Sequence, residues 1–307
     1  MNGRPALVAF LALLGAGWGM TQPLAKLSVS GAYRQFGIIF WQLVIGALLL
    51  GAITWLRGRP LPMTARHLRL YVFIALVGTL LPNAASLQAA VHLPAGIVSI
   101  LLSLVPMVSF PMALALGVDR FSWPRMAGLG CGLAGVVLIV GPDAGLPDPG
   151  MLVFVPLALI APVFYGVEGN AVAKWGTAGL DPIQLLFGAS LVGAVLALPA
   201  ALLLGQWISP LPPWGVADLA LALNAVIHAL VYAGYVWLLG RAGVVFAVQV
   251  SYLVTGFGVL WSMLLLDEAY SGWVWAAMAL MFAGLFLVQP RPNKVLVPPP
   301  PVANDTG

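Results

Sequence analysis

Long apolar runs alternate along the chain with short breaks that carry charge, proline or glycine, such as Arg57-Gly-Arg-Pro and Pro210-Leu-Pro-Pro. A helix that spans a membrane needs about 20 mostly apolar residues, and ten runs of that kind are present. The predicted spans are Pro5–Leu27, Phe36–Leu56, Leu68–Val91, Ala95–Gly117, Pro124–Gly141, Gly150–Trp175, Asp181–Leu204, Trp214–Leu239, Gly243–Leu266 and Ser271–Gln289.

The runs are apolar on all sides, which favours helices over membrane β-strands, since strands alternate lipid-facing and lumen-facing positions. The first run continues through Trp18 and Pro23 to Lys26. It is therefore longer than the apolar core of a cleaved signal peptide and is predicted to be the first spanning helix. The tail after Arg291 contains the four prolines Pro298–Pro301, which predict a disordered segment.

Composition supports a membrane protein. Charged residues make up 7% of the 307 residues, against about 25% in soluble globular chains. Hydrophobic residues reach 62%, and the mean hydropathy is +1.03. A soluble domain of this length could not bury that much apolar surface. A disulfide scaffold is excluded as well, because Cys131 is the single cysteine.

The basic residues fall on one side of the ten-span arrangement when the N-terminus is placed in the cytoplasm, as the positive-inside rule requires. Only Lys26 and Arg34 fall outside. We therefore expect a multi-pass protein of a bacterial cytoplasmic (inner) membrane with both termini cytoplasmic, and no binding of nucleic acid. The inside residues are Arg4, Arg57, Arg59, Arg66, Arg69, Arg120, Arg125, Lys174, Arg241, Arg291 and Lys294.

The chain also resembles itself at an offset of about 147 to 149 residues. Ala95-Gly-Ile-Val aligns with Ala242-Gly-Val-Val, and Lys26 aligns with Lys174. Each copy holds five spans, an odd number, so the second copy enters the membrane from the opposite side, as in many secondary transporters. The expected fold is an all-α integral membrane protein with ten transmembrane helices, two inverted five-helix repeats around a central cavity. The repeats are 1–141 and 142–290, followed by the tail 291–307.

Polar residues inside the spans tend to face a cavity or the bundle interior, because a polar group in hydrocarbon needs a partner. In the eighth span, Asn224, His228 and Tyr232 share one helical face. Glu168 is the only acid well inside a span, and it either meets a substrate ammonium, carries a coupling proton or bonds neighbouring helices. His228 either hydrogen-bonds a substrate carboxylate or takes up a proton, or it bonds a neighbouring helix for stability. The candidate substrate-binding residues are Trp18, Gln22, Asn83, Ser86, Ser99, Ser103, Pro106, Tyr165, Glu168, Asn224, His228, Tyr232, Gln249 and Tyr252.

Sequence motifs of nucleotide-binding and metal-binding sites are absent from the chain. The sequence has no G-x-x-x-x-G-K-[ST] phosphate loop, no H-E-x-x-H and no Cys/His cluster. The three histidines, His67, His92 and His228, lie on different segments. We therefore expect no cofactor, no metal and no enzymatic activity.

Three groups of residues carry a family resemblance. The first is Trp18-Gly19 followed by Pro23-Leu24-Ala25-Lys26. The second is Leu93-Pro94-Ala95-Gly96 with Pro106 in the same span. The third is an acid after the fourth and the ninth spans, Asp119 and Glu268, each followed by a helix that contains Ala-Gly. Over roughly residues 5–290 the chain resembles the drug/metabolite transporter superfamily, and within it the ten-helix EamA-type members. It departs from their pattern at Gly117-Val118-Asp119, where the family usually has Gly-Glu.

Within that family the chain is most similar to exporters of the YddG type, which release aromatic amino acids. The resemblance implies a central cavity lined by spans 1, 3, 4, 6, 8 and 9, with spans 5 and 10 at the periphery. The expected function is a secondary transporter that exports small metabolites, amino acids including aromatic ones and also organic cations, by alternating access. The expected partners are this small-molecule substrate and the lipid bilayer, and the chain is expected to act as a monomer. Two alternatives remain open, an intramembrane enzyme that acts on a lipid-like substrate and a passive channel.

Overall fold

The computed structural model describes residues 4–31, 33–141, 146–247 and 249–288. Within these ranges every regular element is a helix, so the predicted all-α class is confirmed. The predicted disordered tail, with Arg291 and Lys294, lies outside the described residues.

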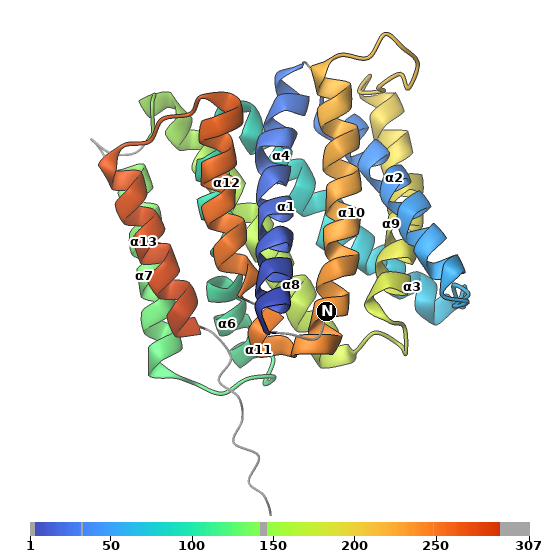
Figure 1. The fold of residues 1–307 in the computed structure, drawn as a ribbon, viewed down its shortest axis with the longest axis horizontal. Helices are drawn as coiled ribbons and strands as arrows, with labels where there is room; N and C mark the ends of the chain where they lie inside the picture. The colour runs from blue at the N-terminus through green and yellow to red at the C-terminus, as the bar shows by residue number, and fades with distance from the viewer. Residues whose placement is uncertain (1–3, 32, 142–145, 248, 289–307) are drawn as a thin grey trace, which may run out of the picture.

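The helices follow the predicted spans closely, and several spans are divided into two or three elements (Figure 1). Their bounds are α1 Arg4–Ser30, α2 Gln35–Leu56, α3 Ala65–Phe73, η1 Ile74–Leu80, α4 Leu81–His92, α5 Ala95–Leu102, α6 Val105–Ala115, α7 Trp123–Val140, η2 Pro149–Phe154, α8 Val155–Trp175, α9 Pro182–Leu203, α10 Val216–Ala242, α11 Val244–Ala247, α12 Val250–Leu266 and α13 Gly272–Val288.

Eight helical segments of the described chain are long and apolar enough to cross a membrane. The last two predicted spans correspond to shorter apolar helices, Val250–Leu266 and Gly272–Val288, of 17 residues each. A helix of 17 residues lies at the lower limit for spanning the hydrocarbon core of a bilayer. The ten predicted segments are thus all helical.

The third span contains a π-helical segment, η1, between α3 and α4. Helix α4 follows it at once, and Pro82 is the second residue of that helix. Because proline has no N–H and its ring displaces the carbonyl four residues earlier, a regular α-helix cannot continue through this point. The wider π turn absorbs the mismatch, and such turns are frequent at functional sites.

The fourth span breaks between α5 and α6. The N–H groups of Ser103 and Leu104 bond to the carbonyls of Ile100 and Leu101, a tighter 3₁₀-like pattern. Pro106 then occupies the first turn of α6, where its missing N–H removes no helical bond. The break places Leu102, Ser103, Val105 and Pro106 on the wall of the central cavity described below.

The bundle is organised around two central helices, α1 and α8. Helix α1 packs against α10 and α12, while α8 packs against α4 and α6. Polar side chains join two of these pairs. Trp261 Nε1 of α12 donates to the Ala16 carbonyl of α1 (2.9 Å), and Asn170 Nδ2 of α8 donates to the Ser109 carbonyl of α6 (3.0 Å). The pairs α2–α9 and α7–α13 lie at opposite sides of the bundle (Figure 1).

Asp181 organises one loop end of the bundle by capping α9. Its carboxylate accepts from the backbone N–H groups of Ile183 (2.9 Å) and Gln184 (3.1 Å) and pairs with Arg57 and Arg59, both at 3.2 Å. Burial alone would raise the pKa of Asp181, but the bond from Gln184 and the charge of Arg57 together hold that pKa below its ordinary value. The residue therefore stabilises the fold in its ionised form.

We expect Asp181→Ala to lower the free energy of unfolding by about 1 kcal/mol at pH 7, because the cap of α9 is lost. Asp181→Asn, which keeps the capping oxygen, should lose less. A depressed folded-state pKa stabilises the fold above the ordinary pKa of aspartate, about 4, and this contribution disappears as the pH falls through the folded value. The difference between wild type and Asp181→Ala in thermal unfolding midpoint, measured in detergent, should therefore shrink towards pH 3. An equal midpoint at pH 7 would contradict this role, and Asp148→Ala, at the exposed cap of η2, is the control.

Candidate functional site

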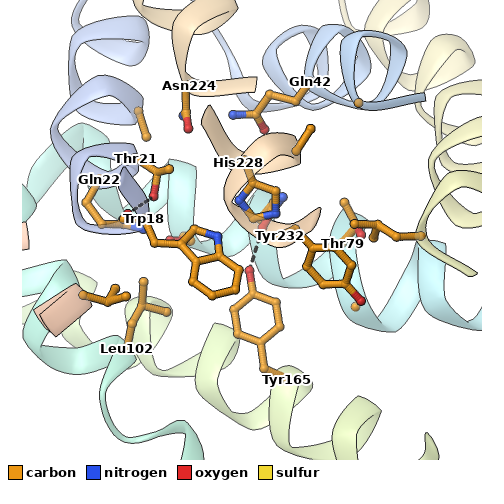
Figure 2. Close-up of a pocket in the computed structure, with 18 of the residues that line it drawn as sticks. Trp18, Thr21, Gln22, Gln42, Thr79, Leu102, Tyr165, Asn224, His228 and Tyr232 are labelled. Carbon is orange, nitrogen blue, oxygen red and sulfur yellow. Dashed lines mark hydrogen bonds between the residues drawn. The ribbon is translucent and has the colours of Figure 1, made fainter. Parts of the chain in front are cut away.

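A cavity of about 510 Å³ lies in the middle of the bundle, within the range typical of small-molecule sites. All the predicted site residues except Gln249 and Tyr252 line it. The side chains of Trp18, His228 and Tyr165 point toward its centre (Figure 2). The predicted residues that line the cavity are Trp18, Gln22, Asn83, Ser86, Ser99, Ser103, Pro106, Tyr165, Glu168, Asn224, His228 and Tyr232.

The two candidate residues of the ninth span do not line this cavity. Gln249 is exposed at the start of α12, and the Tyr252 ring packs 5.9 Å from Phe282 of α13. The cavity face of α12 instead presents Val250, Ser251, Val254 and Thr255. In a helix that is apolar on all sides, polarity gives little information about the face, and neighbouring residues point about 100° apart.

The predicted face of α10 does line the cavity. Asn224, His228 and Tyr232 follow one another at four-residue spacing and all contribute to the wall. The Trp18 ring of α1 lies 6.2 Å from the His228 ring and 5.3 Å from the Tyr235 ring. Helices α1 and α10 thus supply an aromatic wall with an imidazole in it.

Opposite this wall, the Tyr165 hydroxyl of α8 donates a hydrogen bond of 2.7 Å to Asn83 Oδ1 of α4. Because the Asn83 oxygen accepts this bond, the orientation of the Asn83 side-chain amide is fixed, and its NH₂ group remains as a hydrogen-bond donor. In Figure 2, Tyr165 reaches toward the cavity centre from below the Trp18 ring.

Two of the predicted hydroxyls serve the backbone of their own helix. Ser99 Oγ donates to the Ala95 carbonyl (3.1 Å), and Ser103 Oγ donates to the Ile100 carbonyl (2.6 Å) at the break between α5 and α6. Their protons are therefore used inside the protein, and toward a ligand these oxygens act as acceptors.

The Glu168 carboxyl group packs directly against Gly78 of the π segment. A Cβ atom added at Gly78 would lie 2.5 Å from the Glu168 carboxyl carbon and 2.6 Å from Oε1, so any larger residue there would force this carboxyl group to move. Among the residues that line the cavity, Glu168 is the one acid, and none is lysine or arginine. The polar groups of the cavity therefore suit a solute that carries a positive charge or no net charge.

The sequence reasoning missed two cavity-lining helices. Helices α2 and α9, the second and seventh spans, line the cavity in addition to the six spans that the resemblance implied. Gln42 was detectable as a polar residue in one of the most apolar runs. The hydroxyl residues gave no such signal, because Ser and Thr satisfy themselves on their own helix backbone, as Thr21 does with the Trp18 carbonyl. The polar lining residues that were missed are Thr21, Gln42, Thr79, Ser190, Ser251 and Thr255.

Within the described part of the chain, no group of three or more His, Cys, Asp or Glu residues is placed to hold a metal ion. The cavity chemistry therefore rests on amides, hydroxyls, aromatic rings, His228 and Glu168.

Comparisons with known proteins agree with this architecture. A solved crystal structure superimposes on 93% of this chain and 96% of its own, with a TM-score of 0.64 and 21% identity, which is a likeness of fold. A WAT1-related protein of Arabidopsis thaliana is 25% identical over 142 residues, 46% of this chain and 39% of that protein's length.

The model of the EamA-like transporter family matches residues 6–141 and again 152–289. These two matches together cover most of the chain. The protein is therefore a multi-pass membrane protein that belongs to the EamA-like transporter family.

Proposed function

We propose that this protein is a secondary transporter that exports small amphipathic metabolites, amino acids including aromatic ones and also organic cations, by alternating access. The observation that carries the proposal is the central cavity, in which one carboxyl group, one imidazole and several amides surround aromatic rings. Family membership supports transport rather than catalysis.

The cavity offers a complementary group for each part of an amino acid. The Glu168 carboxylate suits an ammonium group. The side chains of His228 and Asn224 suit a carboxylate as hydrogen-bond donors. The rings of Trp18 and Tyr232 offer an apolar, polarisable wall for a planar side chain or an organic cation.

The proposed mechanism uses two inverted halves that rock around this cavity. The double match of one family model supports a repeat. So does the pairing of contacts, since α1 contacts α10 and α12 in the way that α8 contacts α4 and α6. The breaks beside Pro82 and Pro106 offer bending points next to the cavity.

The proposal has three further parts. The direction of transport is export from the cytoplasm, the location is the cytoplasmic (inner) membrane with both termini inside, and the protein acts as a monomer. Export rests on the resemblance to the YddG-type transporters, and the orientation rests on the distribution of basic residues.

Proteoliposomes that contain the purified protein should transport at least one member of a panel of amino acids and organic cations. Transport of solutes with an ammonium group should fall about tenfold or more in Glu168→Gln, because a charge-assisted contact is lost.

If Glu168 or His228 couples transport to protons, a proton gradient should drive accumulation in the wild type and fail to do so in Glu168→Gln or His228→Ala. His67→Ala and Asp148→Asn, both outside the cavity, should behave like the wild type.

Absence of flux for every solute on the panel would contradict the proposal, and proton-driven accumulation that persists in both variants would exclude proton coupling through these residues. Flux that never concentrates a solute under any gradient would favour the passive channel. Conversion of a lipid-like substrate that depends on both Glu168 and His228 would favour the intramembrane enzyme.

Gly78→Ala should reduce flux by about tenfold or more without unfolding the protein, because the new methyl group displaces the Glu168 carboxyl group. Gly130→Ala is a matched control, since a Cβ at Gly130 has no described atom within 4 Å. Flux and thermal midpoint are measured for both variants. Equal flux in Gly78→Ala and Gly130→Ala would show that the position of Glu168 does not matter.

A further inference from the structure

The corner between α4 and α5 is held by a lysine from another helix. Lys26 Nζ, near the end of α1, donates to the backbone carbonyls of Ala90 (2.7 Å), Val91 (3.2 Å) and Leu93 (3.1 Å). These carbonyls lie at the C-terminal end of α4, where the last carbonyl groups have no N–H partner within the helix and the helix dipole places a partial negative charge. A half-buried cation is therefore matched to the end of a helix.

On the other side of the same corner, an acid meets the start of α5. The Glu268 carboxylate, just after α12, accepts from the backbone N–H groups of Ala95 (2.8 Å) and Gly96 (3.2 Å). The Tyr270 hydroxyl donates to the same carboxylate. A Cβ atom at Gly96 would collide with that hydroxyl, so glycine permits the close approach.

We name this arrangement the first clamp, formed by Lys26, Glu268 and the α4–α5 corner. It lies directly beyond one end of the cavity, because Ala25 precedes Lys26 and Leu87 lies about one turn before the bonded carbonyls, and both residues line the cavity. Glu268 belongs to the second half of the chain, whereas the corner belongs to the first. The first clamp thus joins the two halves beside the cavity.

Each of the three parts has a counterpart in the other half of the chain. Lys174 corresponds to Lys26, Asp119 corresponds to Glu268, and the break at Gly243 between α10 and α11 corresponds to the α4–α5 corner. In both halves a residue with left-handed backbone ends the helix before the acid, Gly117 (φ 69°) before Asp119 and Asp267 (φ 52°) before Glu268.

These counterparts hold other partners in this structure. Lys174 is exposed, and its Nζ donates to the Leu116 carbonyl at the end of α6 (3.1 Å). The exposed carboxylate of Asp119 pairs with Arg125 and accepts from the Arg120 N–H (2.7 Å). One end of the molecule is therefore clamped by half-buried charges, while the equivalent charges at the other end lie at the surface.

We propose that Lys174 and Asp119 form a second clamp on the α10–α11 corner in another conformation, and that the two clamps alternate as the gates of the cavity. This rests on the proposed transport function. The acids explain why the clamps exclude each other. Glu268 of the second half reaches the corner of the first half, and in the second clamp Asp119 of the first half would reach the corner of the second half. A rocking motion that brings Asp119 to the α10–α11 corner draws Glu268 away from α5. When released, the charges regain water, which offsets the bonds that are broken.

Pairs of spin labels test this without any need for transport. On a Cys131→Ala background, which removes the single native cysteine, one pair is placed at Val91 and Ala269 beside the first clamp. The second pair is placed at Gly240 and Arg120, the positions 149 residues before or after them. Double electron–electron resonance reports the distance within each pair for the protein reconstituted in lipid.

We expect Lys26→Met and Glu268→Gln to lengthen the 91–269 distance and shorten the 240–120 distance, with about a tenfold change in the ratio of the two populations. Lys174→Met and Asp119→Asn should do the opposite and confine the protein to the first-clamp state. Lys26→Arg keeps the cation and should preserve the distances. Arg34→Met and Arg66→Met, exposed at helix starts, control for the loss of one positive charge.

The proposal is overturned if the Lys26 and Lys174 variants shift the distances in the same direction, or if Lys174→Met and Asp119→Asn leave both pairs unchanged. Should Lys26→Met fail to fold, Glu268→Gln and the two variants at the other end decide the question. Opposite distance shifts without flux would refute the transport function and keep the two clamps, whereas flux without such shifts would keep transport and refute the clamps.

Discussion

In hydrocarbon, each backbone N–H or carbonyl without a partner costs several kcal/mol, and the structure of this protein follows from that constraint. An unbroken helix satisfies it internally, but a cavity for a polar solute requires breaks. The most demanding break is the α4–α5 corner, where the last carbonyls of one helix and the first N–H groups of the next face the bundle. Lys26 satisfies the carbonyls and Glu268 satisfies the N–H groups. Two full charges are thereby placed where helix dipoles favour them.

The same constraint decides which groups remain for a solute. The hydroxyls of Ser99 and Ser103 donate to the backbone of their own helix, and the Tyr165 hydroxyl donates to Asn83. The carboxyl group of Glu168, by contrast, faces a glycine in a π turn and borders the cavity. The cavity thus combines a mostly satisfied polar wall with a few groups that a ligand can engage, which is the usual basis of orientation and specificity in small-molecule sites.

Much of the fold and part of the site were predictable from local patterns. The limits of the spans follow from runs of apolar residues, since the transfer of a helix into hydrocarbon is a sum over its own side chains. The stripe of Asn224, His228 and Tyr232 was also visible, because polar residues at helical spacing stand out in an apolar run. The same reasoning favoured Gln249 and Tyr252 in α12, which instead lines the cavity with Val250, Ser251, Val254 and Thr255, and it overlooked the contribution of α2 and α9.

By itself, then, the sequence determined the class of protein, the helical segments and most of the polar residues of the cavity. Only the tertiary structure decided which face of α2, α9 and α12 meets the cavity, because helices that are apolar all round carry no periodic signal for their orientation. It alone brought Lys26 and Glu268, from opposite ends of the chain, to one corner. Such a meeting depends on the backbone groups that a helix break leaves unpaired, and only the packing of the helices decides which side chains reach these groups.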